Sequence, residues 1–258
     1  MIENILPLIP KHGCYVEPFC GGATIFFAKK KTSCEILNDK NKQLINFYRV
    51  LKNESLRTKL LQKCNETLYS REHHFQAVDL FWNGNDVEKA WALWFKINTG
   101  FSGKLHGGFS TTKNPESNPA RKFSNYKINL ARCGHRIEDA QIESIDAIDC
   151  IRIYDSDKTF FYVDPPYLNA DQGHYRGYSE ADFKNLLETL TEIKGKFLLS
   201  CYPGEMIYDY ISAYEWNDSS FGFKVRARNP KFGPQKEKTE MLVWNYDIQK
   251  NQMELFNA

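Results

Sequence analysis

The stretch Thr159-Phe160-Phe161-Tyr162-Val163-Asp164-Pro165-Pro166-Tyr167 decides the fold and holds the most informative residues of the chain. Its first five residues are mostly aromatic or β-branched, which predicts a buried strand. The two prolines fix φ, remove two N–H donors and restrict the residues before them, so the strand should end in a stiff turn. That turn offers the Asp164 carboxylate, backbone carbonyls and the Tyr167 ring, a set that suits a flat heterocycle with an exocyclic amine. The alternative is a turn that proline merely stiffens.

The first 53 residues have the pattern of one half of a doubly wound α/β sheet. In chain order we expect a strand at 14–19, a glycine turn at 20–23, a helix at 24–30, a strand at 33–37, the pair Asn38-Asp39 and a helix at 40–52. The α/β pattern returns after residue 140. There we expect strands at 141–145, 159–163 and 196–200, helices at 146–154, 180–193 and 206–213, and an antiparallel pair at 219–228 and 239–246.

The middle of the chain differs from both flanks. Helical apolar spacing predicts helices at 56–68, 72–82 and 87–97, and a polar stretch rich in Gly, Ser, Thr, Asn and Pro at 98–126 predicts a long loop. The sequence therefore predicts a core domain formed by 1–53 and 137–258, with a mainly helical insertion at 54–136.

Composition excludes several classes of protein. No run of about 18 apolar residues occurs, and the amino terminus lacks a basic region, so we expect no membrane span and no signal peptide. The seven cysteines are scattered and include no CxxC pair, which argues against a disulfide framework or a zinc site and favours a reducing cytoplasm. We expect no metal ion.

Positive charge is concentrated in two stretches, although the net charge of the chain is only +2. Residues 96–127 and 224–238 each hold six Lys or Arg side chains against one Glu. Two such stretches suggest one positive face for a polyanion. The alternative is a pair of solvated loops.

Two further sites lie in the first half-sheet. The glycines of Glu17-Pro18-Phe19-Cys20-Gly21-Gly22 let a ligand approach the backbone closely, although a tight strand-to-helix turn needs the same residues. Asp39 follows the second strand, 18 residues after Gly21. An acid there commonly bonds the ribose hydroxyls of an adenosine cofactor. The alternative is that Asn38 or Asp39 caps the next helix.

In this order, the series 15–22, Asn38-Asp39-Lys40-Asn41 and Asp164-Pro165-Pro166-Tyr167 resembles the Dam-type (DPPY, α-group) DNA adenine N6-methyltransferases. Smaller matches at 44–50, 96–103 and 200–202 extend the resemblance over about residues 5–246. The resemblance implies an α/β fold: a Rossmann-like S-adenosylmethionine-dependent methyltransferase sheet with the insertion as target-recognition region. It also implies site-specific transfer of a methyl group from S-adenosyl-L-methionine to the exocyclic amine (N6) of a flipped adenine in duplex DNA.

Site residues follow from the resemblance and from the basic stretches. The resemblance implies catalytic roles for Asp164, Pro165, Pro166 and Tyr167. It implies cofactor binding by Glu17, Phe19, Gly21, Gly22, Asp39, Asp146 and Asp164, with Asp149 as an alternative to Asp146. The basic stretches suggest DNA contacts by Lys104, Arg121, Lys122, Arg226, Arg228 and Lys231, and adenine-edge contacts by Asn98, Asn114 or Asn125.

The chemistry expected at Asp164 is positioning rather than proton abstraction. The target amine is a weak nucleophile because its lone pair is delocalised into the ring. Hydrogen bonds from the amine to Asp164 and the Pro165 carbonyl would draw it toward tetrahedral geometry. A duplex hides the amine, so the base must flip out and stack on Tyr167. The chain has no Pro-Cys pair, which argues against methylation of a cytosine ring carbon.

One departure from the family keeps alternatives open. Dam-type enzymes usually begin with a Lys-x-x-Gly-Gly-Lys stretch, which is absent here, and Met1 falls inside the helix that normally follows it. The alternatives are an enzyme of the same fold acting on the cytosine exocyclic amine or on RNA, and a weakly active DNA-binding remnant. Expected partners are double-stranded DNA and a cognate restriction endonuclease, with the chain a monomer or weak dimer in the cytoplasm of a bacterial, archaeal or phage-infected cell.

Overall fold

The structure is a computed structural model that describes residues 2–100, 107–113, 118–167, 177–224 and 237–248. The chain divides into two compact units. The first consists of Met1–Asn38 and Ile145–Ala258, and the second of Asp39–Ser144.

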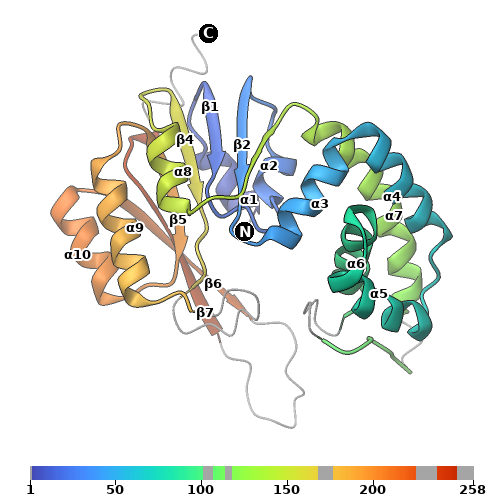
Figure 1. Cartoon of the computed structure of the whole chain (residues 1–258). Helices are drawn as coiled ribbons and strands as arrows, with labels where there is room; N and C mark the ends of the chain where they lie inside the picture. The colour runs from blue at the N-terminus through green and yellow to red at the C-terminus, as the bar shows by residue number, and fades with distance from the viewer. Residues whose placement is uncertain (1, 101–106, 114–117, 168–176, 225–236, 249–258) are drawn as a thin grey trace. The chain divides into compact units, whose positions relative to one another are not determined.

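Six strands of the first unit pair in the order β2-β1-β4-β5-β7-β6 (Figure 1). The four that pair in parallel are β1 (Cys14–Glu17), β2 (Cys34–Asn38), β4 (Thr159–Val163) and β5 (Lys196–Cys201). The closing antiparallel pair is β6 (Asn217–Lys224) and β7 (Glu237–Trp244), and β7 also runs antiparallel to β5. Every residue of β4 is buried, as expected for a parallel strand covered on both faces.

Helices α8 (Ala147–Tyr154), α9 (Glu180–Glu192) and α10 (Glu205–Tyr214) pack on one face of this sheet (Figure 1). They form one apolar core with Val16, Ile36, Phe161 and Phe197 from the four parallel strands. The unit also holds α1 (Ile2–Ile5), the 3₁₀ turn η1 (Leu6–Leu8) and α2 (Thr24–Ala28). This core fixes the carboxyl ends of β1, β4 and β5, where the candidate site lies.

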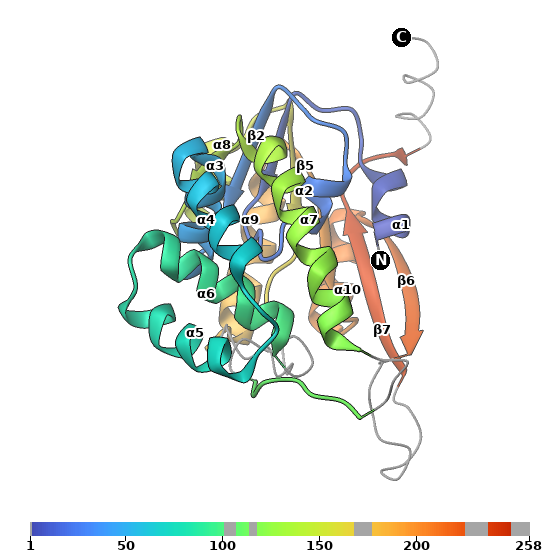
Figure 2. The ribbon, with the colours of Figure 1, turned by 90° about the vertical axis from the view of Figure 1, so that its right-hand side faces the viewer.

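The second unit is mainly helical (Figure 2). Its elements are α3 (Lys42–Lys52), α4 (Glu54–Glu66), α5 (Arg71–Asn83), α6 (Asp86–Thr99), α7 (Pro119–Ile137) and the short strand β3 (Gln141–Glu143). Helix α6 contacts the other four helices and is the most buried of them, because its Trp91, Leu93 and Phe95 side chains fill the centre of the bundle.

The expected loop at 98–126 is wrong at its carboxyl side, because helix α7 begins at Pro119. The Asn118 side chain accepts from the Ala120 backbone N–H at 3.0 Å, and proline suits the first helical position. Phe123, Leu130 and Ile137 are spaced seven residues apart, so they lie on one face of the helix, and all three are buried. The polar residues that suggested a loop form the solvent face of this helix.

The other predicted elements are present, with their ends shifted by one or two residues; residues 225–228 of the predicted antiparallel pair lie outside the described part. In the described part of the chain, no helix combines the length and apolarity needed to cross a membrane.

Candidate active site

A cavity of about 370 Å³ lies in the first unit at the carboxyl ends of the parallel strands. Ligands of open α/β sheets usually bind at that edge. The cavity is lined by the glycine turn after β1, by the Asp-Pro-Pro-Tyr turn after β4, by Ser200 of β5 and by Glu240 of β7. The structure therefore brings together the predicted residues Glu17, Phe19, Gly21, Gly22, Asp164, Pro165, Pro166 and Tyr167.

The glycine turn has a conformation that needs glycine. The Ala23 N–H donates to the Cys20 carbonyl at 2.6 Å, and Gly21 has φ +45°. A Cβ atom at Gly21 would meet nothing within 4 Å, so the backbone conformation rather than crowding favours glycine. The Cys20 N–H donates to the Asn38 carbonyl at 2.8 Å, which ties the turn to the end of β2.

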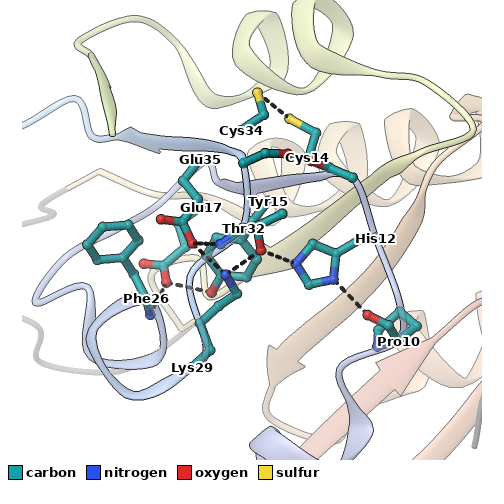
Figure 3. A network of polar contacts seen from close by, with 12 residues as sticks. Pro10, His12, Cys14, Tyr15, Glu17, Phe26, Lys29, Thr32, Cys34 and Glu35 are labelled. Carbon is teal, nitrogen blue, oxygen red and sulfur yellow. Dashed lines mark hydrogen bonds and ion pairs between the residues drawn. The ribbon is translucent and has the colours of Figure 1, made fainter. Parts of the chain in front are cut away.

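Glu17, at the end of β1, is 1% exposed. Its Oε1 accepts from the Tyr15 hydroxyl at 2.6 Å and from the Phe26 N–H at 2.8 Å (Figure 3). Phe26 lies in the first turn of α2, whose N-cap residue Ala23 makes no side-chain bond, so Glu17 takes over part of the capping. Burial raises the pKa of Glu17 to about 8, although both hydrogen bonds favour its charged form.

This raised pKa predicts a stability that falls as the pH rises. The folded chain retains a proton on Glu17 between its ordinary pKa of 4.5 and about 8, whereas the unfolded chain has lost it. The free energy of unfolding of the wild type should therefore decrease across this window. Glu17→Gln, which cannot ionise, should show a shallower decrease when chemical denaturation is measured at pH 5, 6, 7 and 8. Equal slopes for both proteins would contradict the assignment to Glu17.

Asp164 is the first residue after β4 and is exposed to solvent through the cavity, while Pro165 and Pro166 behind it are buried. Enough protein surrounds the carboxyl on its other sides for desolvation to raise its pKa to about 6. A hydrogen bond with the Tyr167 side chain acts in the opposite direction, and the charge of Glu240 adds to the rise. Asp164 is therefore an accessible carboxylate that is ionised at neutral pH.

The Tyr167 side chain is fixed at both its ring and its hydroxyl. The hydroxyl lies 2.8 Å from Ser200 Oγ, which is buried at the end of β5. The ring packs against Tyr202 with centroids 4.5 Å apart and planes tilted by 55°. Two neighbouring strand ends therefore hold the aromatic group that follows Asp164.

Two predicted cofactor residues do not line this cavity. Asp39 is a buried residue of the second unit, and its Oδ1 accepts from the Asn41 N–H at 2.8 Å. The alternative that Asn38 or Asp39 caps the next helix is wrong, because Asn41 caps α3 by accepting from the Gln43 and Leu44 N–H groups.

Asp146, in the first unit, is the N-cap of α8. Its side chain accepts from the Ile148 N–H at 3.0 Å, and Asp149 lies in the first turn of the same helix.

Only some of the residues predicted to contact DNA lie in the described part of the structure. Arg121 and Lys122 are exposed on α7 of the second unit, and so is Asn125. Asn98 donates to the Trp94 carbonyl within α6 at 2.8 Å. The remaining predictions lie outside the described residues, namely Lys104, Asn114, Arg226, Arg228 and Lys231.

Two residues of the site region escaped the sequence reasoning. Glu240 lines the cavity from β7, and only the pairing of β7 with β5 reveals this position. The hydroxyl of Tyr178 is buried and finds no hydrogen-bond partner among the described residues, and its ring meets Phe19 edge-on at 6.3 Å. An aromatic residue just before the capping box of α9 was the available signal for Tyr178.

Parallel strands that end in a glycine turn and in Asp-Pro-Pro-Tyr around one cavity define a Rossmann-like methyltransferase. A model of the D12 class N6 adenine-specific DNA methyltransferases matches residues 1–229, and the chain belongs to that family. The Type II methyltransferase M1.LlaDCHI of Lactococcus lactis subsp. cremoris is 24% identical over an alignment 277 residues long. This alignment covers 95% of this chain and 91% of the relative.

The crystal structure of precorrin 8W decarboxylase from Methanobacterium thermoautotrophicum is 15% identical, with a TM-score of 0.28 over 53% of this chain and 67% of that chain. A likeness this low supports no argument.

Family membership confirms the predicted fold and the predicted enzyme class. The chain is an adenine-specific DNA methyltransferase, so DNA is its substrate and it uses a methyl donor. Membership of this family favours adenine in DNA as the substrate over the cytosine exocyclic amine or RNA. The described residues contain no group of three or more His, Cys, Asp or Glu side chains arranged to hold a metal ion.

Proposed function

We propose that the chain transfers a methyl group from S-adenosyl-L-methionine to N6 of an adenine that is flipped out of duplex DNA at a specific sequence. One observation carries this proposal. A single cavity has the glycine turn on one side and the Asp164–Tyr167 turn on another. A methyl donor held by the first turn would face an amine held by the second.

The residues present fit the proposed cofactor. The cavity volume of about 370 Å³ is in the range of small-molecule sites. The Asp164 and Glu240 carboxylates line it, and their combined field favours a cationic ligand. When bound, S-adenosylmethionine supplies an activated methyl group on a positively charged sulfur. Phe19, Gly21 and Gly22 would hold it, and the resemblance adds Asp39 for the ribose and Asp146 for the adenine ring.

The chain's own contribution to the reaction is orientation of the target amine. The Asp164 carboxylate and the Pro165 carbonyl would accept the two amine hydrogens and direct the nitrogen lone pair toward the methyl donor. Tyr167, held by Ser200 and Tyr202, would present a ring face for the flipped base. Pro166, buried behind the turn, would limit its movement.

Two measurements on the full chain test this proposal. A calorimetric titration with S-adenosylmethionine should show one saturable site. Incubation with methyl-labelled cofactor and duplex DNA, followed by nucleoside analysis, should place the label on N6-methyladenine. Absence of cofactor binding, or label on another nucleoside, would sink the proposal. Cofactor binding without transfer to any DNA would instead favour a weakly active DNA-binding remnant.

For target recognition we propose the insertion at 54–136, and within it the exposed face of α7. Helix α7 contains five Lys or Arg residues and no Asp or Glu. Arg121 and Lys122 would contact phosphate or guanine, and Asn125 on the same exposed surface suits an adenine edge. The sequence adds Lys104, Arg226, Arg228 and Lys231 as further phosphate contacts. Because a relative is a type II methyltransferase, we propose a cognate restriction endonuclease as a partner of a monomer or weak dimer.

Removal of the two α7 charges should weaken DNA binding in a salt-dependent way. For Arg121→Ala/Lys122→Ala, the magnitude of the slope of log affinity against log salt should decrease by about 2. Each phosphate contact releases about one counterion on binding, and the double variant lacks two such contacts. Fluorescence anisotropy with a labelled duplex at several salt concentrations measures this slope. The control is Lys184→Ala on α9, an exposed lysine of the first unit, which should leave the slope unchanged. An unchanged slope in the double variant would show that these α7 side chains do not contact DNA phosphates.

A further inference from the structure

Cys14 and Cys34 form a pair of thiols that the methyltransferase site does not use. They are the first residues of β1 and β2 and are partners in the register of this parallel strand pair. The Cys14 thiol donates to Cys34 Sγ at 3.2 Å, and Figure 3 shows the two side chains pointing toward each other. No disulfide joins them.

The backbone geometry of this pair suits a disulfide. Neighbouring strands lie about 4.7–4.9 Å apart, within the Cα separation of about 4.4–6.8 Å that a disulfide spans. Both side chains at a register position of a parallel pair point to the same face of the sheet, so the sulfurs can approach without movement of the strands. The 3.2 Å contact shows that they already do so.

Access to solvent separates this pair from most other cysteines of the chain. Cys14 and Cys34 are half-buried, whereas Cys20, Cys64, Cys150 and Cys201 are buried. Cys133 is also half-buried, but it lies on α7 in the second unit. A small reagent can therefore reach the pair, and Cys133 offers a matched single thiol for comparison.

We propose that Cys14 and Cys34 form a thiol–disulfide exchange site. A low-molecular-weight disulfide such as oxidised glutathione would oxidise the two thiols there to a Cys14–Cys34 disulfide. One protein thiolate attacks a sulfur of the glutathione disulfide, and a glutathione thiolate leaves. The second protein thiolate attacks the protein sulfur of this mixed disulfide, forms the Cys14–Cys34 bond and displaces the second glutathione thiolate. The two protein protons end on the two glutathione thiols, so the protein is oxidised and the glutathione is reduced.

This site is separate from the active-site cavity. The pair lies at the amino ends of β1 and β2, whereas the cavity lies at the carboxyl ends, where Glu17 ends β1. Glu17 lies three residue steps beyond Cys14 along β1, which is about 10 Å at the rise of an extended strand. A bridge between Cys14 and Cys34 would join the strands on the side away from the catalytic residues.

The local environment makes the exchange slow. Burial, with a contribution from the hydrogen bond to Cys34, raises the pKa of Cys14 to about 12. The thiol is therefore protonated near neutral pH, and the incubation must last hours.

Mass mapping of the full chain tests the proposal. The reduced protein is incubated with oxidised glutathione, quenched with acid, alkylated and digested. The expected main product is a joined pair of peptides containing Cys14 and Cys34, two hydrogens lighter than the two reduced peptides. The proposal is overturned if both cysteines remain fully alkylated while Cys133 reacts, or if glutathione persists on either one in the wild type.

Two variants show whether the second thiol completes the exchange. Cys34→Ser should trap glutathione on Cys14, because the thiol that displaces it is missing. Cys133→Ser should leave the Cys14–Cys34 bridge unchanged. A Cys34→Ser protein in which Cys14 joins a different cysteine would contradict a dedicated pair. The result on the wild type decides the proposal even if this variant fails to fold.

Discussion

Asp164→Asn is expected to lower the rate of methyl transfer by about 10³-fold, the size of effect seen when one preorganised polar group is removed from an active site. Asparagine keeps the size of the side chain but replaces one acceptor oxygen with an NH₂ group. That NH₂ group would face the hydrogens of the target amine instead of accepting them. Since Asp164 also contributes negative charge to the cavity, we expect cofactor binding to weaken, but by less than tenfold, about 1.4 kcal/mol.

Single-turnover transfer of labelled methyl to duplex DNA measures the rate, and calorimetry measures cofactor binding separately. The control is Asp209→Asn on α10, which removes an exposed carboxylate outside the cavity. We expect the control to match the wild type. An Asp164→Asn enzyme within tenfold of the wild-type rate would mean that another group orients the amine.

The pKa of Asp164 sets the direction of the pH dependence. Because the pKa is raised to about 6, the carboxyl is protonated below that pH and loses its acceptor character. The transfer rate should fall about tenfold for each pH unit below 6 and level off above 7. The residual activity of Asp164→Asn should lack this acidic limb. A wild-type profile that is flat from pH 5 to 8 would contradict the assignment.

The parallel part of the fold was predictable because its strands are buried on both faces. Thr159–Val163 reads as a continuous apolar run, and prolines or glycines mark where the neighbouring turns begin. The carboxyl ends of parallel strands lie at the same edge of a sheet, so the turns that follow β1 and β4 lie close together. Both turns line the same cavity.

Other parts of the site depend on tertiary pairing that no local pattern shows. Glu240 reaches the cavity because β7 inserts between β5 and β6, a strand order that alternation of side chains does not specify. Tyr178 immediately precedes the N-cap of α9, and its contact with the Phe19 ring is a tertiary contact between residues far apart in the sequence. The start of α7 was missed because polar residues such as Arg121, Lys122 and Asn125 are typical of a loop. Here they are polar because they face solvent on a helix.

Glu35→Leu is expected to destabilise the first unit by about 3–5 kcal/mol, because it breaks a buried ion pair by removing one partner. Lys29 Nζ lies 2.6 Å from Glu35 Oε1, and the two side chains are 4% and 3% exposed. The same Lys29 Nζ donates to Thr32 Oγ1 at 2.9 Å and lies 4.2 Å from the centre of the Tyr15 ring. Loss of the carboxylate would expose this buried cation to an environment that cannot solvate it.

The double variant Lys29→Met/Glu35→Leu separates charge burial from packing. With both charges replaced by apolar side chains of similar length, most of the lost stability should return, because no buried charge remains. Chemical denaturation of the wild type, both single variants and the double variant gives the coupling energy. The control is Glu188→Gln, which breaks the exposed Lys184–Glu188 pair at 3.8 Å and should cost less than about 1 kcal/mol.

The effect should reach the active site through Tyr15. The ring of Tyr15 lies beside Lys29, and its hydroxyl donates to Glu17 in the wall of the cavity (Figure 3). If Lys29 serves only to neutralise Glu35, the double variant should recover cofactor binding together with stability. If Lys29 also fixes the Tyr15 ring, the double variant should regain stability but bind S-adenosylmethionine more weakly than the wild type. A double variant less stable than either single variant would contradict the ion-pair explanation itself, because removal of both charges would then cost more than leaving one of them buried.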